Sequence, residues 1–304
     1  MNSFLLDNLQ SYFIGEIREN ELLKFHTGFR IGGPARLMLI PKGIEDLRRA
    51  IVWAGREKIP YRVIGNGTSV LAHHDGYDGL VIKLVNVLNH IRIEGHRIYA
   101  GAGATMTALL RQAINHRLTG LERWWGVPSS IGGWLIRMGM AQAPELDYLI
   151  QEVYVMEPDG SITRWIEPSQ LFVEDNSNII KRVIIEVVFQ LKPGDSEGTA
   201  NKITARQVEW EFLTQICLPM AGPVFLTHYK DLTEVFIKTG ILSLHKGRAA
   251  FLGIGNGYVA NLGGTEYDEV LDLLEEIKER VTKLTDLKFR IGLSLLQTKE
   301  VIRC

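Results

Sequence analysis

Glycine-rich turns in the first half of the chain constrain its fold more strongly than any other feature. Glycine is the one unusual count, at 30 of 304 residues, and it gathers where short apolar runs end. The turns are Gly65-Asn66-Gly67-Thr68-Ser69, Gly101-Ala102-Gly103-Ala104 and Gly126-Val127-Pro128-Ser129-Ser130-Ile131-Gly132-Gly133. Without a Cβ, backbone N–H groups can converge on an anion such as a pyrophosphate. A lone G-x-G turn is usually structural, but three glycine-rich turns in one half favour a bound anion.

The first two turns do not complete the fingerprint of a Rossmann dinucleotide site. That fingerprint needs a third glycine three positions after the second, where this chain has Val70 and Met106. Each turn follows a β-rich run, Tyr61–Ile64 and His96–Ala100. The pattern therefore predicts strand-to-loop junctions and does not support a Rossmann dinucleotide site.

The charge balance and the termini narrow the classes of partner. With 34 Lys and Arg against 35 Asp and Glu, the chain has no basic field that would collect a nucleic acid. No apolar run approaches the ~18–20 residues of a membrane span, and Asp7 interrupts an N-terminus that has no basic segment. The two cysteines, Cys217 and Cys304, lack metal-ligand spacing. We expect a cytoplasmic protein without structural zinc or a disulfide framework.

The order of apolar patterns predicts a chain of alternating strands and helices. A helix is expected from Ile44, with Leu47, Ile51 and Ala54 on its buried face. A second helix should follow Thr105 as its N-cap. Val183–Leu191 reads as a buried strand, because its apolar residues do not alternate.

A linker divides the chain near residue 195. Lys192–Gly198 combines proline, glycine and charges, and a length of 304 residues suits about two domains. Beyond the linker we expect helices at Thr204–Ile216 and Leu232–Lys238, and a long helix whose core stripe runs from Tyr267 to Leu284.

Ordered motifs in the first half resemble those of the UDP-N-acetylenolpyruvoylglucosamine reductase (MurB) family. They are His26-Thr27-Gly28-Phe29-Arg30-Ile31-Gly32-Gly33-Pro34-Ala35, Val63–Leu71 and Gly120-Leu121-Glu122 followed by Gly126–Gly133, with weaker matches at Pro219–Phe225 and Tyr258–Asn261. The resemblance covers roughly residues 22–295. It implies an α+β fold, in which a two-lobed FAD-binding domain of the vanillyl-alcohol-oxidase/MurB type precedes a smaller α/β MurB C-terminal domain.

The resemblance also implies domain boundaries and a cofactor site. The expected units are an N-terminal extension at 1–21, an FAD-binding domain at 22–195 with lobes of about 22–84 and 85–195, and a C-terminal substrate-type domain at 196–304. FAD would be bound noncovalently. Residues that would wrap its pyrophosphate or complete its cleft are Gly65, Asn66, Gly67, Thr68, Ser69, Gly126, Ser129, Ser130 and Gly132, joined by Arg30, Gly101 and Gly103.

The family's proton donor is missing from this chain. In the family, NADPH reduces the flavin, the flavin gives hydride to an enolpyruvyl double bond, and a Ser or Cys in a P-S-A-G-S/C-x-F-K-N-P motif donates a proton. This chain has Pro223 at the donor position, and Leu226 and Thr227 replace the Lys and Asn. Proline has no exchangeable side-chain proton, so that position cannot supply the acid.

The family's Arg and Glu are missing as well. The Arg of the F-x-Y-R-x-S motif aligns on Asp175, which reverses the charge at a site for an anionic substrate. The Glu of the L-E-P-E-V segment aligns on Arg290 or Gly292. After Gly133, the family's M-N-A-G-A-Y-G reads Arg137–Ala143, and Trp134 replaces a small residue, which alters the flavin end of the cleft.

Other residues of the chain could replace the missing proton donor, bind a metal or stack on a ligand, but each has a simpler structural interpretation. His228, Tyr229 and Lys230 could donate a proton, but such residues are more often on the surface, and Cys217 reads as a small buried hydrophobe. His73-His74-Asp75 could ligate a metal but reads better as a loop, and Trp124-Trp125 reads better as core than as a stacking platform.

Three readings of the function stay open. In the first, the chain is an FAD-binding relative without reductase activity that acts as a regulator or ligand-binding protein, with a nucleotide sugar or a cell-wall synthesis protein as candidate partner. In the second, it is an active NADPH-dependent reductase with rearranged catalytic groups or another substrate. In the third, only the fold remains, the glycine turns are empty, and an exposed surface serves a protein partner. Use of NADPH as a cofactor is in doubt.

Overall fold

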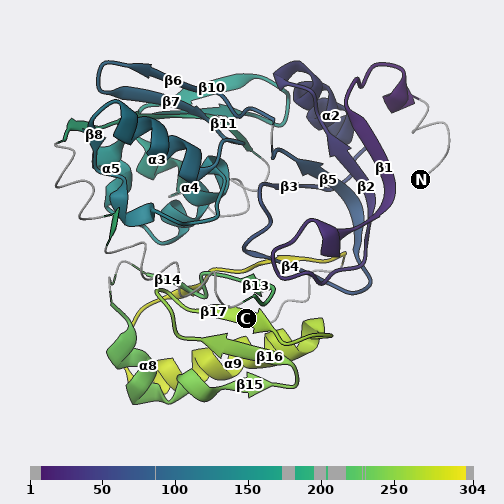
Figure 1. The fold of residues 1–304 in the computed structure, drawn as a ribbon. Coiled ribbons are helices and arrows are strands. Elements are labelled where there is room, and N and C mark those ends of the chain that lie inside the picture. Colours follow the sequence, from purple (N-terminus) through teal and green to yellow (C-terminus); the bar gives the residue numbers. More distant parts are fainter. Residues whose placement is uncertain are drawn as a thin grey trace.

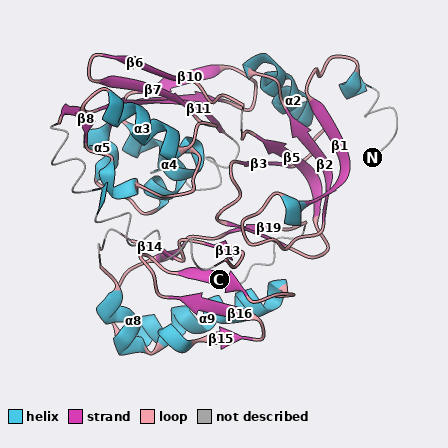
Figure 2. Cartoon of the chain, in the orientation of Figure 1, coloured by secondary structure: helices cyan, strands magenta, loops and turns pink. Residues whose placement is uncertain are grey.

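The computed structural model describes residues 8–85, 87–172, 182–194, 203–204, 217–227, 229 and 231–298. Two lobes lie side by side at the top of Figure 1, and a third unit, drawn in green and yellow, lies below them. Figure 2 shows that each lobe combines a sheet with helices, as does the unit below. No helix in the described ranges is both long and apolar enough to cross a membrane.

The first lobe is a four-stranded mixed sheet covered by one long helix. Its strand order is β1-β2-β5-β3; β1 pairs with β2 antiparallel, and β5 pairs with both β2 and β3 in parallel. The bounds are β1 (Glu16–Leu22), η1 (Leu23–Phe25), β2 (Pro34–Ile40), α2 (Ile44–Arg56), β3 (Tyr61–Ile64), β4 (Val70–Ala72) and β5 (Tyr77–Lys83). The predicted face of α2 is confirmed, since Leu47, Ile51 and Ala54 are fully buried.

The first lobe begins before residue 22, within the segment 1–21 that was expected to be an N-terminal extension. β1 starts at Glu16 and supplies an edge strand of the sheet, and Leu9 and Phe13 belong to the core of this lobe. The sequence hides this strand because Glu16–Leu22 is largely charged. An edge strand that covers no core on its outer side does not need an apolar pattern.

The second lobe is an antiparallel five-stranded sheet with its helices on one face. The strand order is β10-β9-β11-β7-β6. The bounds are β6 (Ile91–Glu94), β7 (Arg97–Gly101), α3 (Met106–Asn115), β8 (Leu118–Thr119), η2 (Glu122–Trp124), α4 (Ile131–Met140), α5 (Glu145–Leu149), β9 (Ile150–Met156), β10 (Ile162–Trp165), η3 (Pro168–Phe172), β11 (Val183–Gln190) and β12 (Lys192–Pro193).

Two local predictions for this lobe are confirmed. Thr105 caps α3, because its Oγ1 accepts a hydrogen bond from the Ala108 N–H at 3.1 Å. The strand β11 lies between β9 and β7 and is buried on both faces. Helix α4 was not predicted, because the glycines and apolar residues of Ile131–Met140 leave no polar face from which a 3.6-residue period could be read.

The third unit packs helix α9 on a small sheet of order β13-β17-β16-β15, and helix α8 packs against α9. The bounds are β13 (Met220–Ala221), β14 (Phe225–Leu226), α8 (Thr233–Thr239), η4 (Ile241–Ser243), β15 (His245–Lys246), β16 (Ala249–Leu252), β17 (Tyr258–Asn261), α9 (Tyr267–Leu284), β18 (Arg290–Ile291) and β19 (Ser294–Leu296). Most of the predicted stripe of α9 is buried, but Leu271 is only half-buried and Leu284 is 44% exposed at the helix end. The helix expected at Thr204–Ile216 lies almost wholly outside the described residues.

The chain does not stay in the third unit to its end. β19 pairs in parallel with β4, with Ser294 opposite Val70 and Leu296 opposite Ala72. The core of the third unit also takes in Phe29 and Leu71 from the first-lobe segment. The expected C-terminal domain at 196–304 is thus joined to the first lobe by a shared core and a shared pair of strands.

A buried asparagine fastens the third unit to the N-terminal half. The Asn261 Nδ2 donates to the Phe29 carbonyl oxygen at 3.0 Å, and the Asn261 Oδ1 accepts from the buried Thr265 N–H at 3.3 Å. The side chain is only 5% exposed, so water cannot replace these partners.

We predict that Asn261→Ala destabilises the protein by about 2 kcal/mol, because it leaves a buried carbonyl and a buried N–H without partners. The exposed Asn89 supplies the matched control, and Asn89→Ala should change the stability by less than about 0.5 kcal/mol. Urea unfolding followed by circular dichroism measures both. Equal stability of the two variants would contradict the role assigned to Asn261.

Candidate functional site

The loop between β3 and β4 offers a run of free backbone donors. Gly67 has a φ of +68°, and a Cβ there would collide with the His26 carbonyl oxygen, so only glycine fits. Across the described part of the chain, none of the N–H groups of residues 65–69 donates a hydrogen bond. Successive free N–H groups around a left-handed residue form a concavity that binds anions. This arrangement fits a pyrophosphate.

The third glycine turn closes against this loop. The Asn66 Nδ2 donates to the Pro128 carbonyl oxygen at 3.1 Å, and a Cβ on Gly65 would collide with the Ser130 Oγ. Ser130 is the N-cap of α4 and accepts from the Gly133 N–H at 3.3 Å. The positive end of the α4 dipole therefore lies beside the free N–H groups, which further favours a negatively charged ligand.

Several glycines predicted to bind the cofactor use their N–H groups in hydrogen bonds within the protein. The Gly101 and Gly103 N–H groups donate to the carbonyl oxygens of His90 and Leu88 at 2.9 and 3.1 Å, so they are not available to a phosphate. Gly132 donates to the Ala102 carbonyl oxygen at 2.9 Å and lets α4 approach that residue. Arg30 is exposed, with a φ of +57°. The sequence could not separate these glycines from Gly65 and Gly67, because the motif letters are the same.

Two of the positions aligned with catalytic residues come together in space. A Cβ on Gly292 would collide with the Pro223 carbonyl oxygen, and the Gly292 N–H donates to the Val224 carbonyl oxygen at 2.8 Å. Arg290 is exposed on β18, where it pairs with Leu226. Of the two aligned positions, Arg290 and Gly292, it is therefore Gly292 that contacts Pro223. Neither Gly292 nor Pro223 has a side chain that can exchange a proton. The third position, Asp175, lies outside the described residues.

Pro223 opens onto a cavity of about 300 Å³ between the second lobe and the third unit. The lobe contributes residues of η2, α4 and α5, and the third unit contributes β14 and the segment before β17. Most of the walls are apolar or aromatic, including Trp124, Trp134, Phe225 and Tyr258. Trp124 and Trp134 meet edge to face at 5.1 Å and belong to the lobe's core, which confirms core packing for Trp124.

The cavity also contains a cationic side chain, Arg137, that the sequence analysis does not single out as a site residue. The Arg137 Nη2 donates to the Ser129 Oγ at 2.6 Å, and burial lowers the pKa of Arg137 to about 10. Among the described residues no carboxylate forms an ion pair with it, whereas the neighbouring Arg123 pairs with Glu145. The available signal was the Arg137 position itself, where the aligned family motif carries Met.

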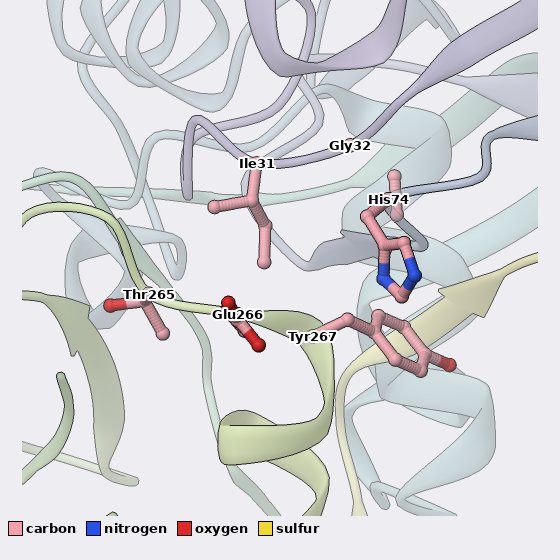
Figure 3. A pocket seen from close by; sticks show the side chains of 7 residues that line it. Ile31, Gly32, His74, Thr265, Glu266 and Tyr267 are labelled. Atoms are coloured by element: carbon pink, nitrogen blue, oxygen red, sulfur yellow. The ribbon is translucent and has the colours of Figure 1, made fainter. Parts of the chain in front are cut away.

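The remaining candidates do not form a convincing site. A second cavity has a volume of about 300 Å³. Figure 3 shows the His74 ring beside the Tyr267 ring among the side chains that line it. The ligand atoms of His73, His74 and Asp75 lie within 4.8 Å of one another, but these residues are neighbours in sequence and the last two are exposed. The structure therefore adds no support to the hypothesis that these three residues bind a metal ion.

Of the substitute proton donors, only Tyr229 lies within the described residues. It is 49% exposed and does not line the cavity. His228 and Lys230 lie outside the described residues. Cys217 is exposed, so the interpretation of this thiol as a small buried hydrophobe is wrong. Cys304 also lies outside the described residues.

Comparison with known proteins agrees with this geometry. Residues 35–165 match the FAD binding domain family, which confirms the prediction of an FAD cofactor. The chain is similar to a solved MurB structure from Thermus caldophilus, with 22% identity, a TM-score of 0.70, and coverage of 93% of this chain and 99% of that one. The α+β fold of the MurB type is thereby confirmed.

Curated relatives span nearly the whole chain. The UDP-N-acetylenolpyruvoylglucosamine reductase of Clostridium botulinum strain Okra is 30% identical over 90% of this chain and 89% of its own length. The reductases of Halalkalibacterium halodurans and Bacillus subtilis are 27% and 24% identical, each over 96% of this chain and 98% of the relative. The chain therefore belongs to the UDP-N-acetylenolpyruvoylglucosamine reductase family.

Proposed function

We propose that this protein binds FAD noncovalently but does not carry out the reductase reaction of its relatives, and that it acts as a regulatory or ligand-binding protein linked to peptidoglycan-precursor synthesis in the cytoplasm. The observation that carries the proposal is that Pro223 lines the cavity and Gly292 lies against its carbonyl oxygen, so that neither aligned position supplies a side chain that could donate a proton. A nucleotide sugar and a cell-wall synthesis protein are the partners we consider.

The structure offers backbone donors for the pyrophosphate of FAD, whereas a tryptophan ring limits the space for its flavin ring. The free N–H groups of residues 65–69 and the N-terminus of α4 would hold its pyrophosphate. The bound flavin would supply hydride-transfer chemistry. The Trp134 ring occupies the core beside the cavity, so it sets a wall at the end where a flavin ring would have to fit.

Hydride addition to a carbon–carbon double bond also requires a proton. The proton must come from a positioned acid, and nearby positive charge or hydrogen-bond donors must stabilise the developing enolate. Pro223 and Gly292 provide neither. This loss would be compatible with binding, which needs no proton transfer, and it supports the proposal of a protein that binds a ligand without reducing it.

A second candidate, an active reductase, would need another acid in the same cavity. Tyr258 is the observation that favours it: its ring packs over Gly222, next to Pro223, and lines the cavity. A tyrosine hydroxyl can donate a proton to a carbanion in a water-poor site. The two candidates differ in whether turnover exists and whether it depends on this hydroxyl.

We predict that the purified protein is yellow and that acid releases FAD, while NADPH fails to bleach the visible absorption band under anaerobic conditions. The free N–H groups are the reason to expect the flavin. A colourless protein that takes up no added FAD would refute this prediction and leave the glycine turns purely structural.

We also predict no NADPH oxidation with UDP-N-acetylglucosamine enolpyruvate, because no acid stands at the Pro223 position. If oxidation is seen, comparison with Tyr258→Phe decides its source. A loss of at least about 100-fold in kcat would establish Tyr258 as the acid and would replace the first candidate by the second.

Gly65→Ala tests the cofactor loop. We expect FAD affinity to fall at least tenfold, because the new Cβ displaces Ser130 and with it the N-terminus of α4. Gly43→Ala is the matched control, since a Cβ at Gly43 meets no atom within 4 Å and its φ of 179° suits any residue. Flavin fluorescence titration measures the affinity, and thermal melting checks the fold. Unchanged affinity in Gly65→Ala would remove this loop from the cofactor site.

A further inference from the structure

We propose that His26 is a positioning residue for the glycine loop of residues 65–69. Its imidazole, held between Lys83 and Glu21, fixes the backbone against which Gly67 packs, and so sets the free N–H groups of the loop in the geometry that binds a pyrophosphate. The inference rests on the proposed function, because it takes FAD as the ligand of this loop. Neither His26 nor its two partners line the cavity at Pro223.

The backbone next to His26 forms the wall behind the loop. A Cβ on Gly67 would collide with the His26 carbonyl oxygen, and the Gly28 N–H donates to the Gly67 carbonyl oxygen at 2.9 Å. Gly67 is also the left-handed residue on which the concavity depends, with a φ of +68°. A shift of residues 26–28 would therefore move the N–H groups of the loop.

The His26 side chain is buried between two charged groups. Its Nε2 lies 2.7 Å from the Glu21 Oε1, and its Nδ1 lies 2.8 Å from the Lys83 Nζ. Only 8% of His26 is exposed, so both contacts are sheltered from water. We call these two contacts the His26 clamp.

The two partners fix the position of the ring proton. A carboxylate only accepts hydrogen bonds and an ammonium only donates them. The Nε2–H therefore donates to Glu21 and the Nδ1 accepts from Lys83, which makes His26 a neutral imidazole with its proton on Nε2.

Both partners depend on this contact for their charge. The hydrogen bond from His26 lowers the pKa of Glu21, and a second one from the Arg18 guanidinium acts in the same direction. Burial lowers the pKa of Lys83, and the imidazole supplies the acceptor that its ammonium needs there. Each side of the clamp is therefore a charge-assisted hydrogen bond.

One imidazole thereby joins three segments around the loop. Glu21 lies on β1 and Lys83 is the last residue of β5, and these strands lie on either side of β2 (Figure 1). Lys83 pairs with Ile64 at the end of β3, directly before the loop begins. The clamp thus connects the start of the loop to the wall behind it.

The contribution of the clamp to binding is preorganisation. When the N–H groups already converge, no binding free energy is lost to ordering the loop. Without the clamp, the loop must order when the pyrophosphate arrives, which lowers the affinity. A packing role alone would depend on the size of the ring and not on its two nitrogens.

Substitutions that separate the hydrogen bonds from the ring test the proposal, by fluorescence titration of FAD into the full-length protein after its flavin has been removed. His26→Phe keeps an aromatic ring and loses both hydrogen bonds, so we expect the affinity for FAD to fall at least about tenfold. His26→Gln keeps one donor and one acceptor, and its affinity should stay within about threefold of the unchanged protein. Unchanged affinity in His26→Phe, or an equal loss in both variants, would overturn the proposal.

Lys83→Met tests the clamp from its other side. We expect it to weaken FAD binding at least about fivefold, and the combined His26→Phe/Lys83→Met variant to bind at most about twofold more weakly than His26→Phe alone, because both changes remove one interaction. Losses that multiply would overturn the clamp. The exposed Lys238 on α8 gives the matched control, and Lys238→Met should leave the affinity unchanged. Thermal melting checks the fold of each variant.

The position of the ring proton gives a test that does not depend on FAD. Nitrogen-15 chemical shifts of the histidine rings, with His26 assigned by its absence from the spectrum of His26→Gln, should show the proton on Nε2 at neutral pH. A proton on Nδ1, or on both nitrogens, would overturn the proposal.

The outcome for the proposed function is read from the unchanged protein. If it binds no FAD, the proposed function and the role of His26 are both refuted. If it binds FAD and turns over the enolpyruvyl sugar with NADPH, only the proposed lack of reductase activity is refuted, and the affinities of the variants still decide the role of His26. If it binds FAD and His26→Phe binds it equally well, only the role of His26 is refuted.

Discussion

Hydrogen bonds join Gly28 and the glycine loop between β3 and β4 to the start of the third unit, and these bonds hold the two sides of the candidate site together. The Met220 N–H donates to the Gly28 carbonyl oxygen and the Gly222 N–H to the Thr68 carbonyl oxygen, each at 3.1 Å, and the Ser69 Oγ donates to the Gly222 carbonyl oxygen. Ser69 is 4% exposed, so this bridge is sheltered from water. Because it uses the carbonyl oxygens and one hydroxyl of the loop, it leaves the loop's N–H groups to a ligand.

The hydrogen bonds that hold Gly222 also fix the position of Pro223, which is the next residue in the chain and lines the cavity. The cavity keeps its shape through core packing around Trp134 and Phe225, and not through the groups that perform chemistry in the relatives.

Local chemistry made part of the fold and site predictable. Thr105 could be recognised as a cap, and α9 could be read from its apolar period, because each depends on residues close in sequence. The pair of Pro223 and Gly292 could only be named as two separate losses, since 69 positions separate them along the chain. The strand β1 was missed for a related reason: its pairing with β2 is set by the partner's backbone and not by its own side chains.

By itself, the sequence determined the class of fold, the FAD-type glycine loop and the loss of the aligned acid, because motif letters and their spacing record which backbone conformations and which side-chain protons are available. Only the tertiary structure decided which glycines have free N–H groups. Gly65 and Gly101 look alike in sequence, but the Gly101 N–H donates to the His90 carbonyl oxygen. It also decided that Arg137 lies partly buried at the cavity without a carboxylate ion-pair partner among the described residues, since burial and pairing depend on which distant segments meet.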